Sequence, residues 1–471
     1  MKNTPSQSVG LLSRIRHIAA SRGDAQAFVF VDHRGEAAEL RWKDLLAAVE
    51  AEVQRIAFHA RPGSLLTAPA VSSQHGISQL LAVLASGHTL LPLDPRSPHE
   101  TKHRLIEQLT SQGAVVDEVE ALLGPGGPAS AAFIEGGYVL ATGGTTGDPK
   151  LVHYPKEPAY RAPSALLKRT GWREFQTQLL AGPLHHAAPF SRLIDGVLSG
   201  NTIVVPRVFK AEAVLGVVER FGVEWAQLTP SNMLVLDDPL RRRPEAFRSL
   251  RGILHTAAPC PADTKRNWIK HLGADRVFEM YTSTEGIGAT LCDGHEWLAR
   301  PGTVGRGFFT RIRIFDDQGL PLPPGGTGTV HMRSVLRNQP AGTMGGYQSV
   351  GDRGHLDEDG YLFLSGRRED LIIVGGENVY VSEVTSAILS CVGVADAAVG
   401  ELPDHQLGSR LCALVVRRPS ASLTVADLLG HCLSRLEPYK VPSEFRFVDA
   451  LPRTPAGKLE RISFSRLMET L

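Results

Sequence analysis

A glycine-rich stretch directly after a short apolar segment places the strongest constraint on this chain. Residues 138–141, Tyr-Val-Leu-Ala, predict a buried strand. The next nine residues hold three glycines, three threonines and Lys150. Glycine adopts φ > 0 and allows close approach to the backbone, so main-chain N–H groups and hydroxyls can converge on an anion. We therefore predict a phosphate-binding loop, with a flexible surface turn as the alternative; its binding residues would be Thr142, Gly143, Gly144, Thr145, Thr146, Gly147 and Lys150.

This loop differs from the P-loop of the common NTPases. That motif ends in Gly-Lys-Ser/Thr, whose hydroxyl binds magnesium. Here Pro149 precedes Lys150 and Leu151 follows it, so both the helix start and the metal ligand are missing. The stretch instead resembles the Thr/Ser-Gly-Thr-Thr-Gly-x-Pro-Lys signature of the adenylate-forming superfamily. That superfamily includes acyl-CoA synthetases, the adenylation domains of peptide synthetases, and luciferases.

Composition narrows the class of protein further. The 471 residues are 42% hydrophobic and 21% charged, as in a globular protein with a full core and two or three domains. A net charge of +1 argues against a nucleic-acid partner. Five scattered cysteines without a Cys-x-x-Cys pair argue for a reducing compartment and against a zinc site. With a polar N-terminus and no run of about 18 apolar residues, we expect a cytoplasmic protein without a membrane partner.

Hydrophobic periodicity indicates alternating helices and strands. Helical spacing appears at 9–22, 42–56 and 76–86, and strand-like runs appear at 27–31, 89–93, 201–206 and 225–230. Such alternation predicts an α/β fold with parallel pairing. Beyond about residue 370, a smaller unit shows strand-like runs at 394–400 and 410–416 and a helical run at 425–433.

Two further segments match the superfamily's pocket and adenine motifs. In residues 182–190, a Pro-x-x-His pattern resembles the segment that borders the acyl pocket, and His186 takes the matching position. A hydrogen-bonded loop histidine is the alternative, and no partner carboxylate for a metal is evident beside His185 and His186. The remaining candidate acyl-pocket residues are Phe190, Ser231 and Gly286. Small residues after an apolar run, Thr256, Ala257 and Ala258, resemble the segment that lines the adenine site.

The segment Tyr281-Thr-Ser-Thr-Glu-Gly286 resembles the superfamily's Tyr-Gly-x-Thr-Glu motif, with Thr282 where glycine is frequent. The resemblance implies that Tyr281 contacts adenine, Thr284 the α-phosphate and Glu285 a Mg²⁺ ion. A carboxylate is a hard ligand that suits Mg²⁺. The alternative is an N-capped helix start.

Asp352 and Arg367 lie in further matching contexts, Val-Gly-Asp and Ser-Gly-Arg. An ionised carboxylate only accepts hydrogen bonds, so Asp352 could hold both ribose hydroxyls. The resemblance implies that Asp352 binds ribose, that Arg367 also contacts the nucleotide, and that the hinge residue is Glu369. Glutamate departs from the usual Asp or Lys at that hinge.

The C-terminal string Pro452-Arg-Thr-Pro-Ala-Gly-Lys458-Leu-Glu-Arg461 resembles the segment that carries the superfamily's catalytic lysine. A solvated loop lysine is the alternative. The implied architecture is an α/β fold with a large, multi-subdomain N-terminal domain, 1–368, and a small mobile α+β domain, 369–471. The chain before the glycine-rich loop is shorter than usual for the superfamily, which leaves the pocket and any oligomer interface in doubt.

The resemblance implies activation of a carboxylic acid by ATP to acyl-AMP, with Mg²⁺, and then transfer to coenzyme A. Lys458, Glu285 and Thr284 would be the catalytic residues. The alternative acceptor is a carrier-protein thiol, and the non-enzymatic alternative is a nucleotide-binding sensor or scaffold. The candidate pocket lacks an Asp for an α-amino group, so aryl, fatty or polycyclic acids are favoured over amino acids. The oligomeric state stays open, with a homodimer as one option.

Overall fold

The computed structural model describes residues 9–61, 63–97, 99–111, 114, 116–118, 136–142, 150–156, 158–160, 163–283, 286–336, 345–367, 371–374, 377–404, 408–418, 421–451 and 468. The chain divides into two compact units, residues 1–227 with 242–253 (unit 1) and residues 228–241 with 254–471 (unit 2). The division runs through strand β13 (Gly252–His255). The domain boundary predicted between residues 368 and 369 falls inside unit 2 and stays a prediction.

Unit 1 contains two groups of mainly parallel strands. One sheet has the order β6-β4-β5-β7-β8, with antiparallel pairing only between β7 and β8. The other group follows the order β12-β10-β11-β2-β3, with an antiparallel β2–β3 pair at its end. The predicted parallel pairing is therefore confirmed in unit 1. The strands are β1 Val9–Gly10, β2 Gln26–Val31, β3 Ala37–Arg41, β4 Leu65–Pro69, β5 Thr89–Leu93, β6 Val116–Glu118, β7 Tyr138–Thr142, β8 Lys150–Tyr154, β9 Ala159–Tyr160, β10 Thr177–Leu179, β11 Thr202–Pro206 and β12 Trp225–Leu228.

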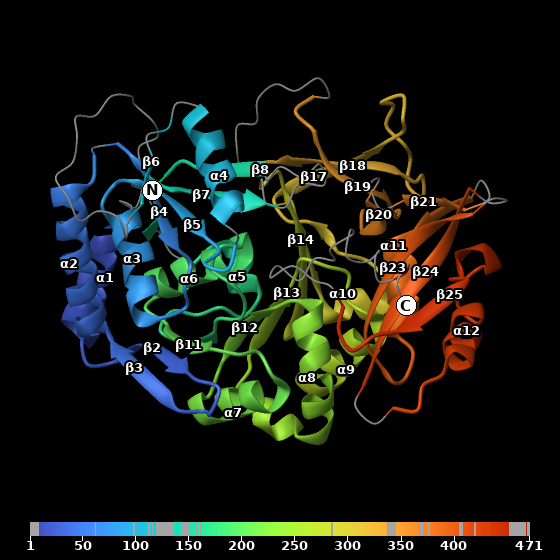
Figure 1. The fold of residues 1–471 in the computed structure, drawn as a ribbon, viewed down its shortest axis with the longest axis horizontal. Coiled ribbons are helices and arrows are strands. Elements are labelled where there is room, and N and C mark those ends of the chain that lie inside the picture. Colours follow the sequence, from blue (N-terminus) through green and yellow to red (C-terminus); the bar gives the residue numbers. More distant parts are fainter. Residues whose placement is uncertain are drawn as a thin grey trace, which may run out of the picture. The chain divides into compact units, whose positions relative to one another are not determined.

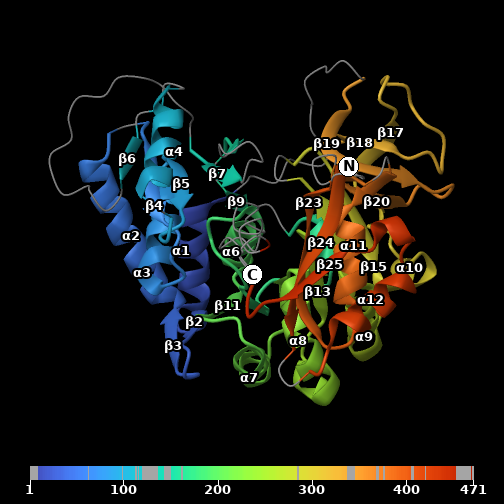
Figure 2. The same ribbon diagram turned by 45° about the vertical axis from the view of Figure 1, so that its right-hand side comes forward.

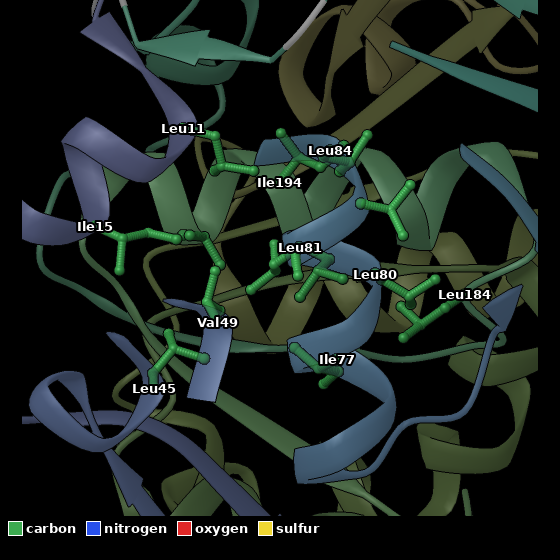
Figure 3. Packing of buried hydrophobic residues seen from close by; sticks show 14 of the residues in the cluster. Leu11, Ile15, Leu45, Val49, Ile77, Leu80, Leu81, Leu84, Leu184 and Ile194 are labelled. Carbon is green, nitrogen blue, oxygen red and sulfur yellow. The ribbon is translucent and has the colours of Figure 1, made fainter. Parts of the chain in front are cut away.

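Amphipathic helices supply the main core of unit 1. Leu11, Ile15 and Ile18 recur at helical spacing and are buried, and α3 is apolar on nearly all sides and almost wholly buried. Helices α1, α2 and α3 lie side by side (Figure 2), and their leucines and isoleucines interdigitate with α6 (Figure 3). The helices are α1 Leu11–Arg22, α2 Trp42–His59, α3 Gln74–Ala85, α4 His99–Ser111, α5 Ala165–Arg169, α6 Ala187–Ser199, α7 Ala211–Phe221 and the 3-10 helix η2 Pro244–Phe247.

Unit 2 is built mainly on antiparallel strands, and β25 pairs with β24 in parallel. Strand β14 pairs with β15, and β15 pairs with β16. A four-stranded sheet follows in the order β17-β18-β19-β20, all antiparallel. The strands are β14 Val277–Thr282, β15 Ala289–Asp293, β16 Arg306–Gly307, β17 Thr310–Phe315, β18 Gly328–Ser334, β19 Gln348–Leu356, β20 Leu362–Arg367, β21 Leu371–Val374, β22 Glu377–Tyr380, β23 Val394–Asp404, β24 Gly408–Arg417 and β25 Glu444–Phe447.

The C-terminal part of unit 2 has a hydrophobic cluster of its own, drawn entirely from residues between 372 and 445. Helix α11 packs against β23 and α12 against β25 (Figure 1). The helices of unit 2 are α8 Pro230–Arg242, which ends at the boundary, α9 Ala262–Leu272, α10 Gly294–Ala299, α11 Val381–Leu389, α12 Val425–Leu433 and the 3-10 helix η4 Pro438–Lys440. Across the part of the chain that the structure describes, every helix is too short or too polar to span a bilayer.

Candidate functional site

The glycine-rich stretch connects two antiparallel strands. β7 and β8 pair along their whole lengths, and the last pair joins Thr142 to Lys150. Lys150 therefore opens a strand, whereas the lysine of a P-loop lies at a helix start. The exclusion of a common NTPase loop is confirmed at this point. Gly143, Gly144, Thr145, Thr146 and Gly147 lie outside the described residues.

Two of the predicted acyl-pocket residues lie in unit 1, at the start of α6. His186 occupies the N-cap position in extended conformation, and its side chain makes no capping hydrogen bond. Phe190 is fully buried and packs edge-on against the Tyr138 ring, with ring centroids 5.0 Å apart. Phe190 is thus a core residue of α6, and its contact with an acyl group stays a prediction.

His185 has a carboxylate neighbour that the sequence did not reveal. Its Nε2 lies 3.6 Å from Oδ2 of Asp94, the residue just after β5. Burial lowers the pKa of His185, while the charge of Asp94 opposes that shift. The absence of a carboxylate partner was therefore a wrong expectation. Even so, no group of three or more His, Cys, Asp or Glu side chains suited to a metal occurs among the described residues.

The predicted adenine segment follows β13 in unit 2. The Thr256 N–H donates to the Leu228 carbonyl at 3.3 Å, which anchors the start of the segment. Ala257 adopts φ = 83°, a left-handed conformation that is strained for a residue with a Cβ. Ala257 and Ala258 are exposed. Ser231, also exposed, lies in the first turn of α8.

Two predicted nucleotide residues meet, although 71 positions separate them in sequence. The Tyr281 hydroxyl, near the end of β14, donates a hydrogen bond to the Asp352 carboxylate on β19. Asp352 is only 9% exposed. It lies in the middle of its strand, Gln348–Leu356. A bulge in the β19–β20 pairing lies between Arg353 and Gly354, one residue beyond Asp352, and bulges re-aim neighbouring side chains.

The described residues on either side of the predicted metal ligand are not helical. Gly286 donates its N–H to the Ser283 carbonyl at 3.0 Å and has φ = 64°. The Thr282 hydroxyl donates to the Gly288 carbonyl at 2.8 Å. Because β14 ends at Thr282 and none of the described residues up to Ala289 is helical, the alternative of a helix start is wrong.

Arg367 is the backbone partner of Asp352 across the β19–β20 ladder. The structure therefore brings two segments of the predicted nucleotide site into register. Thr284, Glu285, Glu369 and Lys458 lie outside the described residues, so their roles stay predictions.

Sequence reasoning missed a buried ion pair between α9 and β14. Lys265 of α9 contacts Glu279, and the side chains are only 1% and 9% exposed. The Lys265 ammonium also lies 4.9 Å from the centroid of the Trp297 ring. His255 on β13 is fully buried, and burial together with the Lys265 charge lowers its pKa. A charged residue inside the apolar face of α9 is the only sequence signal for this cluster.

Comparison with known proteins agrees with the order of the motifs. Residues 137–347 match the family of AMP-binding enzymes, and residues 383–458 match the AMP-binding enzyme C-terminal domain. A 2-succinylbenzoate–CoA ligase of Bacillus licheniformis is 32% identical over 336 residues, covering 69% of this chain and 68% of the relative. A sulfoacetate–CoA ligase of Cupriavidus necator is 31% identical over 339 residues, covering 69% of this chain and 65% of the relative.

The fold is that of the solved o-succinylbenzoate CoA synthetase from Bacillus subtilis in complex with an acyl-adenylate. The TM-score is 0.76 at 24% sequence identity, with 97% of this chain and 98% of that chain covered. The chain therefore belongs to the adenylate-forming superfamily of AMP-binding enzymes, and the predicted α/β fold class is confirmed.

Proposed function

We propose that this protein activates a carboxylic acid with ATP and transfers the acyl group to coenzyme A. The hydrogen bond between Tyr281 and Asp352 carries this proposal, because it joins the predicted adenine and ribose segments. A carboxylate offers about four acceptor sites, so its chemistry allows Asp352 to accept from Tyr281 and from two vicinal hydroxyls at once. The exposed, small residues Ala257 and Ala258 suit a planar ring lying against the backbone. Nucleotide binding therefore fits the residues present.

In the first step, a carboxylate oxygen of the acid attacks the α-phosphorus of ATP, and the bond to pyrophosphate breaks. Negative charge moves onto the departing pyrophosphate, so preorganised positive charge lowers the barrier. Lys458 is our candidate for that charge in this chain. Thr284 would contact the α-phosphate, and Ser231 and Gly286 would border the acyl group.

Mg²⁺, held by Glu285 and the nucleotide phosphates, would neutralise phosphate charge. The carboxylate of Glu285 is the right donor type for that ion. Glu285 lies outside the described residues, and we infer its role from the sequence motif.

In the second step, the thiol sulfur attacks the acyl carbon, AMP leaves with the former carboxylate oxygen, and the thiol proton is released. Coenzyme A is the acceptor we favour, since the relatives named above are CoA ligases. Their substrates, sulfoacetate and 2-succinylbenzoate, differ widely, so the acid acted on by this chain is to be identified by testing a panel of carboxylic acids. A carrier-protein thiol is the competing acceptor, and thioester formation with each of the two acceptors distinguishes them.

The role of Asp352 can be tested by removing its proposed ligands and the residue itself. Hydrogen bonds to charged groups contribute about 1.5–3 kcal/mol, so wild type should bind 2′,3′-dideoxy-ATP about tenfold or more weakly than ATP. The Asp352→Ala variant should bind both nucleotides with the same reduced affinity. Persistent preference for ATP in that variant would show that the ribose hydroxyls are held elsewhere.

A further inference from the structure

The strands that carry Tyr281 and Asp352 belong to different sheets, and residues 303–307 join those sheets. The Val304 N–H donates to the Leu362 carbonyl, and the Leu362 N–H donates to the Gly305 carbonyl, both at 2.9 Å. The next residues form β16, which pairs with β15, and β15 pairs Thr290 with Tyr281. One edge of this connecting segment therefore lies on the Asp352 sheet and the other on the Tyr281 sheet.

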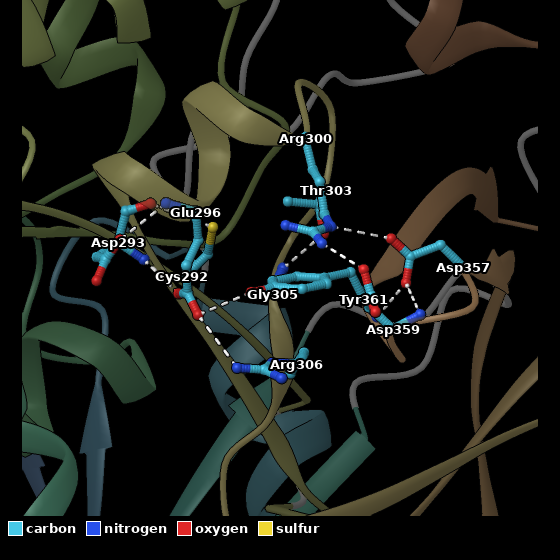
Figure 4. A network of polar contacts seen from close by, with 10 residues as sticks. All are labelled: Cys292, Asp293, Glu296, Arg300, Thr303, Gly305, Arg306, Asp357, Asp359 and Tyr361. Carbon is cyan, nitrogen blue, oxygen red and sulfur yellow. Dashed lines mark hydrogen bonds and ion pairs between the residues drawn. The ribbon is translucent and has the colours of Figure 1, made fainter.

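Arg300, just before this segment, binds the turn between β19 and β20. Its Nε lies 3.2 Å from Asp357 Oδ2, and its Nη2 contacts Asp359. Its guanidinium carbon lies 4.2 Å from the centroid of the Tyr361 ring. Figure 4 shows Arg300 reaching into this acidic turn. One side chain thus fixes the tip of the hairpin whose first strand carries Asp352.

Tyr361 continues the contact to the other sheet. Its ring is 5% exposed, and its hydroxyl donates to Glu296 Oε1 at 3.1 Å (Figure 4). Glu296 and Asp293 form a capping box at the start of α10, directly after β15. Arg306 of β16 also lies over the Tyr361 ring, at 4.7 Å, and its Nη2 is 3.7 Å from Glu296 Oε1. The network therefore runs from the β19–β20 turn to the end of β15.

We propose that Arg300 and Tyr361 are positioning residues for the nucleotide, acting by holding the two sheets so that Tyr281 and Asp352 stay within hydrogen-bond distance. This inference rests on the proposed nucleotide-binding function. The network touches neither Tyr281 nor Asp352, so its effect passes through the paired strands. Isolated half-exposed ion pairs contribute about 0–1 kcal/mol each, and charges joined in a network contribute more, so the test has to separate positioning of the nucleotide from stability.

The test is the affinity of the purified protein for AMP, measured by calorimetry without acid or thiol. Arg300→Met keeps an unbranched apolar stem and removes the charge. We expect AMP to bind about tenfold more weakly, within the range typical of coupling between separate sites. Arg313→Met is the matched control: its guanidinium also lies over a tyrosine ring, 5.0 Å from the Tyr347 centroid, but on β17, outside the network. Arg313→Met should bind AMP like wild type.

A double-mutant cycle separates positioning from simple stability. Residues that act independently change affinity by factors that multiply to within about twofold. If Arg300 acts through the Tyr281–Asp352 contact, Arg300→Met should weaken AMP binding much less in a Tyr281→Phe background. Fully multiplicative effects would overturn the proposal.

Tyr361→Phe keeps the ring and removes only the bond to Glu296, so it covers the case in which Arg300→Met fails to fold. We expect a smaller loss of AMP affinity, about threefold, because this variant removes one hydrogen bond of the network and keeps Arg300 in place. The inference would be overturned if Tyr361→Phe binds AMP with wild-type affinity and Arg300→Met either does not fold or also binds AMP with wild-type affinity. If wild type itself does not bind AMP, the proposed function fails instead, and the two failures are thereby distinguished.

Discussion

Several polar side chains are buried where α9, β13 and β14 meet: Lys265 is on α9, His255 on β13 and Glu279 on β14. Lys265 and Glu279 satisfy each other, because a charge removed from water requires a partner of opposite charge. His255 is different: among the described residues, neither ring nitrogen has a hydrogen-bond partner. Burial and the neighbouring Lys265 charge keep this imidazole neutral in the folded state. Its cost to stability therefore depends on pH.

We predict that His255 contributes to acid destabilisation. The unfolded histidine has a pKa near about 6.5, and the folded one has a lower pKa. Below about pH 6.5 the unfolded chain binds a proton that the folded chain does not, so the free energy of unfolding falls with falling pH, by up to about 1.4 kcal/mol per pH unit. Urea denaturation at several pH values between 7.5 and 5.5 gives the free energy of unfolding as a function of pH. This free energy should fall less steeply with falling pH in His255→Phe than in wild type. Other histidines with lowered pKa values are present in both proteins, so the variant should keep part of the pH dependence. If the free energy of unfolding depends on pH equally in wild type and variant, this account is contradicted.

At the scale of elements, the connecting segment 303–307 depends on a glycine. Gly305 has φ = 94°, and a Cβ there would lie 2.2 Å from the Leu291 carbonyl oxygen on β15. The Thr303 hydroxyl accepts from the Gly305 N–H at 3.0 Å and donates to the Leu362 carbonyl at 2.9 Å. Close approach of two backbones, and not only the turn, therefore requires glycine at this position.

Gly305→Ala should lower stability far more than Gly325→Ala. Both glycines have positive φ, so each alanine costs about 1–2 kcal/mol for the left-handed conformation. Only Gly305 meets a backbone atom; Gly325 has open space within 4 Å. Chemical denaturation of the two variants provides the comparison. Equal losses would mean that strand β15 moves away freely and that the segment does not hold the two sheets in place.

Periodicity predicted several of the longer elements in these units, because each of those segments shows its own pattern of burial. The strand predicted at 89–93 is β5, and the helix predicted at 425–433 is α12, both with unchanged bounds. Strand 225–230 was too long, since Pro230 opens α8. The antiparallel pairing of β14 with β15 was not predicted, because alternation of helices and strands does not reveal a hairpin.

The candidate site was predictable only where a local motif carries the chemistry. Tyr281 and Asp352 were found from two separate motifs, and their hydrogen bond requires the fold. Asp94 and Arg300 lie in no such motif, and their partners are distant in sequence. Long-range pairs of this kind follow from topology, which a single sequence does not specify.

At the scale of the whole molecule, we propose that the two chemical steps use different arrangements of the C-terminal domain, with Glu369 as the hinge, and that Lys458 acts only in the first step. Lys458→Ala should slow acyl-adenylate formation about 10²–10³-fold, the cost of one preorganised electrostatic group. Supplied with synthetic acyl-adenylate and coenzyme A, the same variant should form thioester at nearly the wild-type rate. Both half-reactions are measured on one preparation, with circular dichroism to check folding. A similar fall in both would contradict an adenylation-specific role for Lys458.

The central claim is that a carboxylate oxygen becomes bonded to the α-phosphorus of ATP. Isotope transfer measures this directly. A panel of acids is first screened by acid-dependent exchange of pyrophosphate into ATP, and the best substrate is then prepared with ¹⁸O in both carboxyl oxygens. After turnover with coenzyme A, mass spectrometry of the nucleotide product should find AMP that carries one ¹⁸O per molecule. Unlabelled AMP, or formation of ADP with the label in inorganic phosphate, would contradict the proposed mechanism.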